Sequence, residues 1–218
     1  MKQQTGAEMK QKTCRVIINA DDFGQTESCT KAIYEAFESG LITDTTMVAN
    51  GDAMELAFAL ASQMQGRVGV HLNLTEGTAL TPEIQQNPKF VSHGRFTDYF
   101  KGRGTYFLRL SKKDRQDLYT ELTAQVDRLM DEGIEISHVD SHHHIHCNWM
   151  LAPIIFRVCR EHSIYRIRCT KMSQDDSDCG MGCTRGSTGF GSDGVVSDSQ
   201  IILRAFGCTK NRLPAFRK

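Results

Sequence analysis

The sequence has no excess of charge of either sign, and this absence excludes several classes of function. Among its 218 residues, 26 Lys and Arg are balanced by 26 Asp and Glu, so the formal net charge is zero. Proteins that bind nucleic acids through a broad surface, or anionic membranes through a polybasic segment, carry a marked positive charge. We therefore expect no nucleic-acid partner and no membrane partner.

Long apolar runs are also missing. No segment approaches the roughly 20 consecutive apolar residues that a membrane-spanning helix requires. Residues 1–13 are polar and lack the apolar centre of a secretory signal. We therefore expect a disordered N-terminal extension at 1–13 and a cytoplasmic protein. In that compartment the eight cysteines are expected to be reduced thiols.

Apolar periodicity divides residues 14–169 into alternating strands and helices. Short apolar runs, often β-branched, predict strands, and apolar residues three or four positions apart predict helices. The expected strands are 14–20, 43–49, 68–74, 136–140 and 164–168, and the expected helices are 26–39, 53–64, 113–132 and 151–162. This α/β alternation predicts right-handed β-α-β units and a parallel sheet, which is either open or closed into a barrel.

Two regions depart from this pattern. Residues 75–111 form a long, turn-rich insert, and a loop of this size in a compact domain is typical of a lid or shelf that faces substrate. From residue 170 to 218 the sequence becomes rich in Gly, Ser and Cys, and we assign neither helices nor strands to this atypical tail. We therefore expect one domain at 14–169, between the extension and the tail.

Two adjacent acids, Asp21 and Asp22, directly follow the first expected strand. In parallel α/β folds, functional sites form at the carboxyl ends of the strands. Neighbouring side chains of an extended segment point in opposite directions, so one acid is suited to binding a metal and the other to accepting a proton. The alternative is structural, because Asp-Asp-Phe-Gly also suits a tight turn or a helix N-cap.

Histidines collect at two further strands. His71 lies within the third expected strand, and by itself it is more typical of a buried core residue. The segment 138–146 holds five His among nine residues after the fourth strand begins, and an extended conformation would place His142, His144 and His146 on one face. Two imidazoles and a carboxylate form a recurring ligand set for a divalent ion with positions open to water and substrate. The pattern therefore predicts a catalytic metal site.

At these residues the sequence resembles the YdjC-like carbohydrate deacetylases, a family that includes the chito-oligosaccharide deacetylases. Two motifs carry most of the resemblance, Asp-Asp-Phe-Gly at 21–24 and Asp-Ser-His-His-His-Ile-His at 140–146. The full set of matching stretches, in an order and spacing that fit from residue 14 to about 168, is 19–24, 43–46, 50–51, 69–77 and 138–146.

The resemblance implies a (β/α)-barrel-like fold with parallel strands and a divalent metal, Mg²⁺ or Zn²⁺. By the family motif, Asp22, His71 and His142 match the metal ligands, and Asp21 matches the general base. The implied reaction removes N-acetyl groups from acetylated amino sugars or oligosaccharides by means of a metal-activated water. The resemblance also implies a small acetylated carbohydrate as the substrate and a homodimer as the assembly.

Three further residues near the histidine cluster are candidates for substrate binding. His144 and His146 are each suited to holding the sugar or protonating the leaving amine. Trp149 either stacks on a sugar ring or starts the packing face of the next helix. Asp140 is suited to orienting a ligand histidine.

The C-terminal region departs from the family pattern. Family members continue with further barrel elements and a late His-Pro segment near the site, whereas no His follows His162 here. We therefore expect the C-terminal part of the barrel to be incomplete. Two alternative functions stay open: another metal-dependent hydrolase, such as an amidohydrolase or a phosphoesterase, and a catalytically degenerate protein that binds a metal or a sugar.

Overall fold

The computed structural model describes residues 16–101 and 109–168, together with the backbone of 202–205. The expected extension at 1–13 and most of the expected tail at 170–218 lie outside the described residues. Within the described parts of the chain, no helix is long and apolar enough to cross a membrane.

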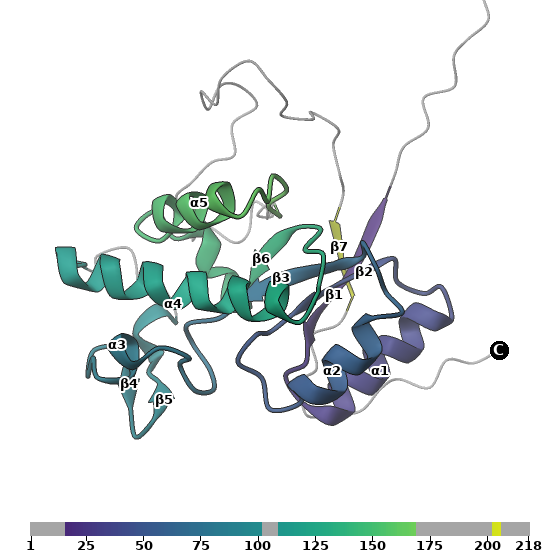
Figure 1. The fold of residues 1–218 in the computed structure, drawn as a ribbon, viewed down its shortest axis with the longest axis horizontal. Coiled ribbons are helices and arrows are strands. Elements are labelled where there is room, and N and C mark those ends of the chain that lie inside the picture. Colours follow the sequence, from purple (N-terminus) through teal and green to yellow (C-terminus); the bar gives the residue numbers. More distant parts are fainter. Residues whose placement is uncertain (1–15, 102–108, 169–201, 206–218) are drawn as a thin grey trace, which may run out of the picture.

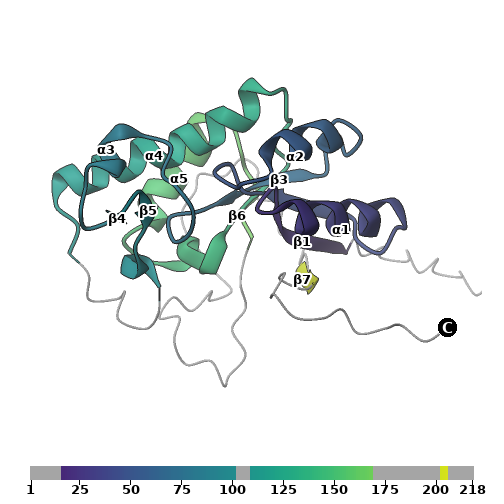
Figure 2. The same cartoon turned by 90° about the horizontal axis from the view of Figure 1, so that it is seen from below.

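Five parallel strands form the central sheet (Figure 1, Figure 2). Their spatial order is β6-β3-β2-β1-β7. The strands are β1 (Ile17–Phe23), β2 (Asp44–Met47), β3 (Val68–Leu72), β6 (Val139–Ser141) and β7 (Ile202–Ala205). The sheet of the described residues is curled and open, which confirms the prediction of a (β/α)-barrel-like fold with an incomplete C-terminal part.

Four longer helices pack around the sheet. They are α1 (Glu27–Glu38), α2 (Met54–Ala61), α4 (Lys112–Asp131) and α5 (Ala152–Glu161). Figure 1 shows α1 and α2 side by side, while α4 runs along α5 and packs on β3. The sequence of α4 explains its formation, because Ser111 and Asp114 form a capping box at its start. Its inner face buries Leu118, Leu122, Val126 and Leu129.

The insert folds as a small unit of its own. It contains α3 (Pro82–Gln85), the antiparallel pair β4 (Val91–Ser92) and β5 (Arg95–Phe96), and the 3₁₀ helix η1 (Asp98–Phe100). The buried rings of Phe90 and Phe100 stack with centroids 5.5 Å apart and belong to the hydrophobic core. The insert thus shares the hydrophobic core of the domain, and α3 packs against α4.

The first strand is longer than the sequence pattern suggested. We expected it to end at residue 20, but β1 continues to Phe23 and includes Asp21 and Asp22. The pairing of β1 with β2 shifts register between Ala20 and Phe23, and Asp22 has a positive φ of 73°. Such local irregularities in a strand change the direction of its side chains and are frequent next to active sites.

Two other expectations about strands need correction. The expected strand at 164–168 is reduced to a single parallel bridge between Val139 and Ile167. Conversely, the tail to which we assigned no strand contains β7, whose backbone pairs with β1. An apolar run as short as this one is a weak local signal, and pairing with the open edge of β1 decides its conformation.

Gly51 lies where the loop after β2 crosses the loop after β1. A Cβ atom at Gly51 would lie 2.1 Å from the carbonyl oxygen of Gly24, and the same oxygen accepts a hydrogen bond from the backbone of Ala53. We predict that Gly51→Ala forces the two loops apart and lowers the free energy of unfolding by about 1–3 kcal/mol, measured by urea denaturation. Ala59→Ser, on the exposed face of α2, is the control and should cost less than about 1 kcal/mol. Unchanged stability of Gly51→Ala would contradict this close approach.

Candidate active site

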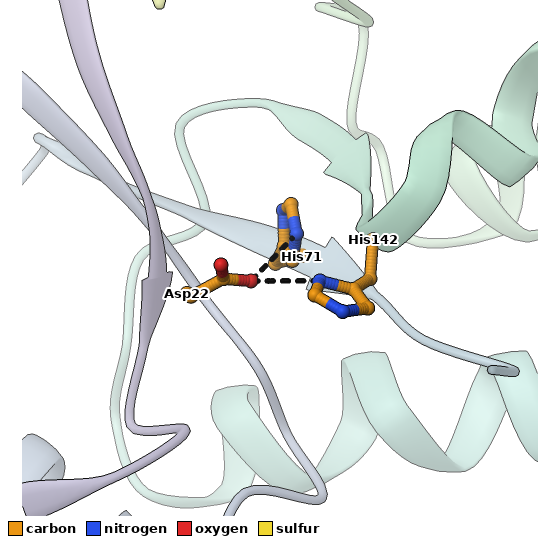
Figure 3. A group of neighbouring side chains, drawn as sticks. All are labelled: Asp22, His71 and His142. Carbon is orange, nitrogen blue, oxygen red and sulfur yellow. Dashed lines mark hydrogen bonds and ion pairs between the residues drawn. The ribbon is translucent and has the colours of Figure 1, made fainter. Parts of the chain in front are cut away.

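Three side chains from different strands converge at the carboxyl end of the sheet (Figure 3). Asp22 comes from the end of β1, His71 from β3, and His142 directly follows β6. The Oδ1 atom of Asp22 lies 3.2 Å from Nε2 of His71 and 2.8 Å from Nδ1 of His142. One carboxylate oxygen and two ring nitrogens thus lie within 4.8 Å of one another, as three protein ligands of a divalent metal do. The structure brings together the three residues that we expected to bind a metal.

The charge of Asp22 is compensated by the two histidines. Burial opposes ionisation of Asp22, but hydrogen bonds and charges from His142 and His71 outweigh burial and hold the pKa of this carboxyl well below its usual range. Burial likewise opposes protonation of His71, but the nearby carboxylates of Asp140 and Asp22 outweigh it and raise the pKa of His71. A positive charge is therefore stabilised at this point, and a divalent cation supplies such a charge when it displaces the proton.

Asp140 contacts the side of His71 that faces away from Asp22. Its Oδ1 atom lies 2.5 Å from Nδ1 of His71, and the Asp140 side chain is fully buried. The hydroxyl of Thr46 lies 3.2 Å from the same ring nitrogen. A hydrogen bond from the remote N–H of an imidazole to a carboxylate fixes the tautomer and the direction of a metal-binding histidine. Asp140 therefore leaves Nε2 of His71 available toward Asp22.

Asp21 belongs to a buried network next to this group. The Nη1 atom of Arg168 donates to both oxygens of Asp21, at 2.8 and 3.0 Å, and to Oδ2 of Asp140 at 3.0 Å. Asn19 also donates to Asp21, at 2.9 Å. An oxygen of Asp21 lies within 4.8 Å of a ring nitrogen of His71. Carboxylate oxygens of both Asp21 and Asp22 therefore lie near ring nitrogens of His71. We expected these two side chains to point in opposite directions, as in an extended segment. They do not, because β1 is irregular at this point.

Arg168 was not among the site residues expected from sequence. Burial opposes its charge, but the carboxylates of Asp21 and Asp140 outweigh burial and raise the pKa of the guanidinium. Its only sequence signal was a basic residue at the end of an expected strand. That position becomes informative only when the fold places it beside the acids of β1 and β6.

The histidine cluster is not extended, which corrects the expectation that His142, His144 and His146 share one face. The segment η3 (His142–Cys147) is a pair of short 3₁₀ turns joined by a kink, at which His143 and His144 adopt left-handed backbone conformations with φ of 50° and 54°. Residues other than glycine rarely adopt such angles, and strain of this kind is concentrated at functional sites. The turn separates the side chains, so that only His142 joins Asp22 and His71.

The three residues expected to bind substrate lie outside the converging group. His146 is buried, its Nδ1 atom contacts the hydroxyl of Ser141, and burial lowers the pKa of His146 to about 4. His144 is half-buried and packs edge-to-face on His146, with ring centroids 6.0 Å apart. Trp149 is exposed just before α5. None of the three contributes to a cluster of potential metal ligands in the described residues, and their contacts with substrate stay predictions.

Glu76 forms a second cluster of potential ligand atoms with His142 and His143. Its Oε2 atom lies 3.4 Å from Nε2 of His142, and its Oε1 atom lies 3.9 Å from Nε2 of His143. Lys101 and Gln25 also contact this carboxylate, at 3.3 and 3.2 Å. Burial raises the pKa of Glu76, but the charges of His142 and Lys101 outweigh burial and lower it. Glu76 lies in the stretch 69–77 that matches the family, and the sequence alone indicated no role for it.

Curated relatives of this chain are named carbohydrate deacetylase. One from Vibrio campbellii is 37% identical over 157 residues, which cover 69% of this chain and 57% of the relative. One from Oceanobacillus iheyensis is 32% identical over 155 residues, covering 69% and 63%, and one from Vibrio vulnificus is 32% identical over 192 residues, covering 86% and 70%. The matched part of this chain thus spans little more than half the length of the Vibrio campbellii protein.

A solved structure is also similar. The crystal structure of a candidate cellobiose-phosphate cleavage protein from Enterococcus faecalis V583 aligns with a TM-score of 0.63 and 28% sequence identity. The alignment covers 77% of this chain and 63% of that protein. The similarity to known proteins therefore extends from sequence to three-dimensional structure.

A family model described as YdjC-like protein matches residues 15–204. The match includes the three converging residues Asp22, His71 and His142. It continues beyond residue 168, where we expected the resemblance to end, and reaches into β7. The chain belongs to the YdjC-like protein family.

Proposed function

We propose that this protein is a metal-dependent carbohydrate deacetylase that removes N-acetyl groups from acetylated amino sugars or oligosaccharides. The observation that carries the proposal is the convergence of Asp22, His71 and His142, with Asp21 beside them. The names of the curated relatives support deacetylation of carbohydrates. One carboxylate and two imidazoles support hydrolysis by a metal-activated water, because three ligands leave coordination positions open.

The donor set fits a divalent cation, and we propose Zn²⁺ or Mg²⁺ as the ion. Imidazole suits Zn²⁺, whereas Mg²⁺ prefers oxygen ligands and keeps several waters. Because two of the three ligands are imidazoles, the residues themselves favour Zn²⁺. Held by Asp22, His71 and His142, the ion would polarise the acetyl carbonyl and acidify a bound water.

Asp21 is the proposed acceptor of the proton from the attacking water. Arg168 and Asn19 fix the Asp21 carboxylate through hydrogen bonds, so its position is set before substrate binds. The leaving amine in turn requires a proton. His144 and His146 are the proposed candidates for its donor.

The proposal also includes the assembly and location that the family resemblance implies. These are a homodimer in the cytoplasm, with a small acetylated carbohydrate as the substrate. The alternative functions, a different metal-dependent hydrolase or a degenerate binding protein, predict other products and are separated by the first of the following experiments.

Metal removal tests the proposed function directly. We predict that the full chain releases acetate from N-acetylated chito-oligosaccharides, that dialysis against EDTA abolishes this release, and that Zn²⁺ or Mg²⁺ restores it. Acetate is measured with a coupled enzymatic assay, and a phosphomonoester is the control substrate. Release of phosphate without acetate would support a phosphoesterase instead, and metal binding without turnover would support a degenerate binding protein.

Replacement of the proposed base separates catalysis from metal binding. Asp21→Asn keeps the size of the side chain but removes its ability to accept a proton, so acetate release should fall by about 100-fold or more. Zn²⁺ affinity, measured by isothermal titration calorimetry, should stay close to that of the wild type. Asp22→Asn is the matched control and should lose both acetate release and Zn²⁺ binding. If Asp21→Asn lost Zn²⁺ binding to the same extent, Asp21 would be a ligand and not the base.

The buried contacts of Arg168 also predict a large effect on stability. Arg168→Met removes the buried guanidinium that bonds to both Asp21 and Asp140, and the free energy of unfolding should fall by about 3–5 kcal/mol in urea denaturation. Arg157→Met is the control, since Arg157 is exposed and pairs with Glu161 at the surface; it should cost less than about 1 kcal/mol. Equal effects of the two substitutions would show that Arg168 is not an essential counter-ion.

A further inference from the structure

Each of the two candidate ligand histidines lies between Asp22 and a second carboxylate. His71 presents Nε2 to Asp22 at 3.2 Å and Nδ1 to Asp140 at 2.5 Å. His142 is turned the other way, with Nδ1 at 2.8 Å from Asp22 and Nε2 at 3.4 Å from Oε2 of Glu76. With a metal ion in place of the protons that face Asp22, the remaining proton would lie on Nδ1 in His71 and on Nε2 in His142, so the two histidines would be opposite tautomers.

The remote nitrogen of His142 needs an acceptor. An imidazole that binds a metal through one nitrogen keeps a proton on the other, and that N–H almost always donates to a carboxylate, a backbone carbonyl or water. The Nε2 atom of His142 is buried and makes no hydrogen bond among the described residues. Glu76 provides an ion-pair contact with this atom, and a separation of 3.4 Å becomes a hydrogen bond after a small side-chain adjustment.

Glu76 is held in place independently of His142. Its Oε2 atom accepts a hydrogen bond from Gln25 at 3.2 Å, and its Oε1 atom lies 3.3 Å from Nζ of Lys101. Its backbone carbonyl accepts hydrogen bonds from the side chains of Asn50 and Asn73, at 3.2 and 2.9 Å. The loop after β1, the loop after β2 and the insert therefore all contribute to its position.

The position of Lys101 distinguishes two possible roles of Glu76, binding a cation and orienting His142. The cluster of Glu76, His142 and His143 has the composition of a cation site. However, the ammonium group of Lys101 already occupies the Oε1 side of the carboxylate, and it would repel a second cation there. Glu76 is therefore better suited to orienting His142 than to binding an ion itself.

We propose that Glu76 is a positioning residue that accepts the Nε2 proton of His142 and so directs Nδ1 toward the metal. The inference rests on the proposed function, because it concerns the metal centre of the deacetylase. Glu76 and Asp140 then have equivalent roles on two histidines of opposite tautomer, and each keeps one ligand nitrogen facing Asp22.

Zn²⁺ titration of the metal-free full chain by isothermal titration calorimetry tests this role. Glu76→Ala should weaken Zn²⁺ binding by about 10-fold or more, and Glu76→Gln, which keeps an acceptor oxygen, should restore part of the affinity. Glu83→Ala, an exposed acid in the same insert, should bind Zn²⁺ like the wild type. Because Glu76 makes partly exposed ion pairs, the metal-free Glu76→Ala protein should melt within about 4 °C of the wild type.

Histidine tautomers provide a second readout. In ¹H–¹⁵N correlation spectra of the Zn²⁺-loaded protein with ¹⁵N-labelled histidine, His142 should carry its proton on Nε2 and His71 on Nδ1. Glu76→Ala should change the signals of His142 and leave those of His71, which is bonded to Asp140, unaltered. A role for Glu76 in folding alone would not produce this selective change.

The possible outcomes separate the inference from the proposed function. If the wild type binds no Zn²⁺, both the metal centre and the role of Glu76 are wrong. If the wild type binds Zn²⁺ and Glu76→Ala binds it equally well with an unchanged His142 tautomer, only the role of Glu76 is wrong. Two Zn²⁺ ions per chain, one of which is lost in Glu76→Ala, would make Glu76 a ligand and would also overturn the inference.

Discussion

The Oδ1 atom of Asp22 lies within 3.2 Å of ring nitrogens that come from two other parts of the chain, and much of the local structure maintains this arrangement. The irregular end of β1, with φ of 73° at Asp22, sets the direction of the carboxylate. The left-handed conformations of His143 and His144 turn the chain directly after His142. Such conformations cost free energy and persist only where the surrounding structure holds them. Their occurrence next to the same carboxylate is consistent with a functional site.

The charge balance of the buried groups favours a divalent cation at this position. Three buried carboxylates, those of Asp21, Asp22 and Asp140, lie close to His71. Arg168 is the buried guanidinium that contacts two of them. With neutral histidines, three carboxylates against one guanidinium leave two negative charges, and unpaired buried charges are costly. A divalent ion would compensate both charges, and metal binding would therefore contribute to stability as well as to chemistry.

Apolar periodicity is a local signal and predicted most of the alternation of strands and helices, whereas the three residues that converge were indicated by the family resemblance. The sequence could not predict how Asp21 and Asp22 both reach His71, since the register shift depends on the pairing of β1 with β2. The extended conformation assumed for the histidine cluster was wrong for a similar reason. Left-handed conformations are rare even for residues such as His143, and the local sequence is too weak a signal to predict them.

Arg168 and Glu76 illustrate what only the fold reveals. Arg168 is far from the acids of β1 in sequence, and its role depends on the return of the chain to β6 after α5. Glu76 lay inside a recognised motif, but its relation to His142 depends on the turn in η3. Asp140, by contrast, lies inside the histidine motif and was expected from sequence to orient a ligand histidine, and it contacts Nδ1 of His71.

The most direct test of the central claim is anomalous X-ray diffraction from a crystal of the full chain loaded with Zn²⁺. The account predicts one ion at about 2.0–2.2 Å from a carboxylate oxygen of Asp22, from Nε2 of His71 and from Nδ1 of His142. An ion held by Asp21 in place of Asp22, or an ion found only between Glu76 and His143, would contradict it.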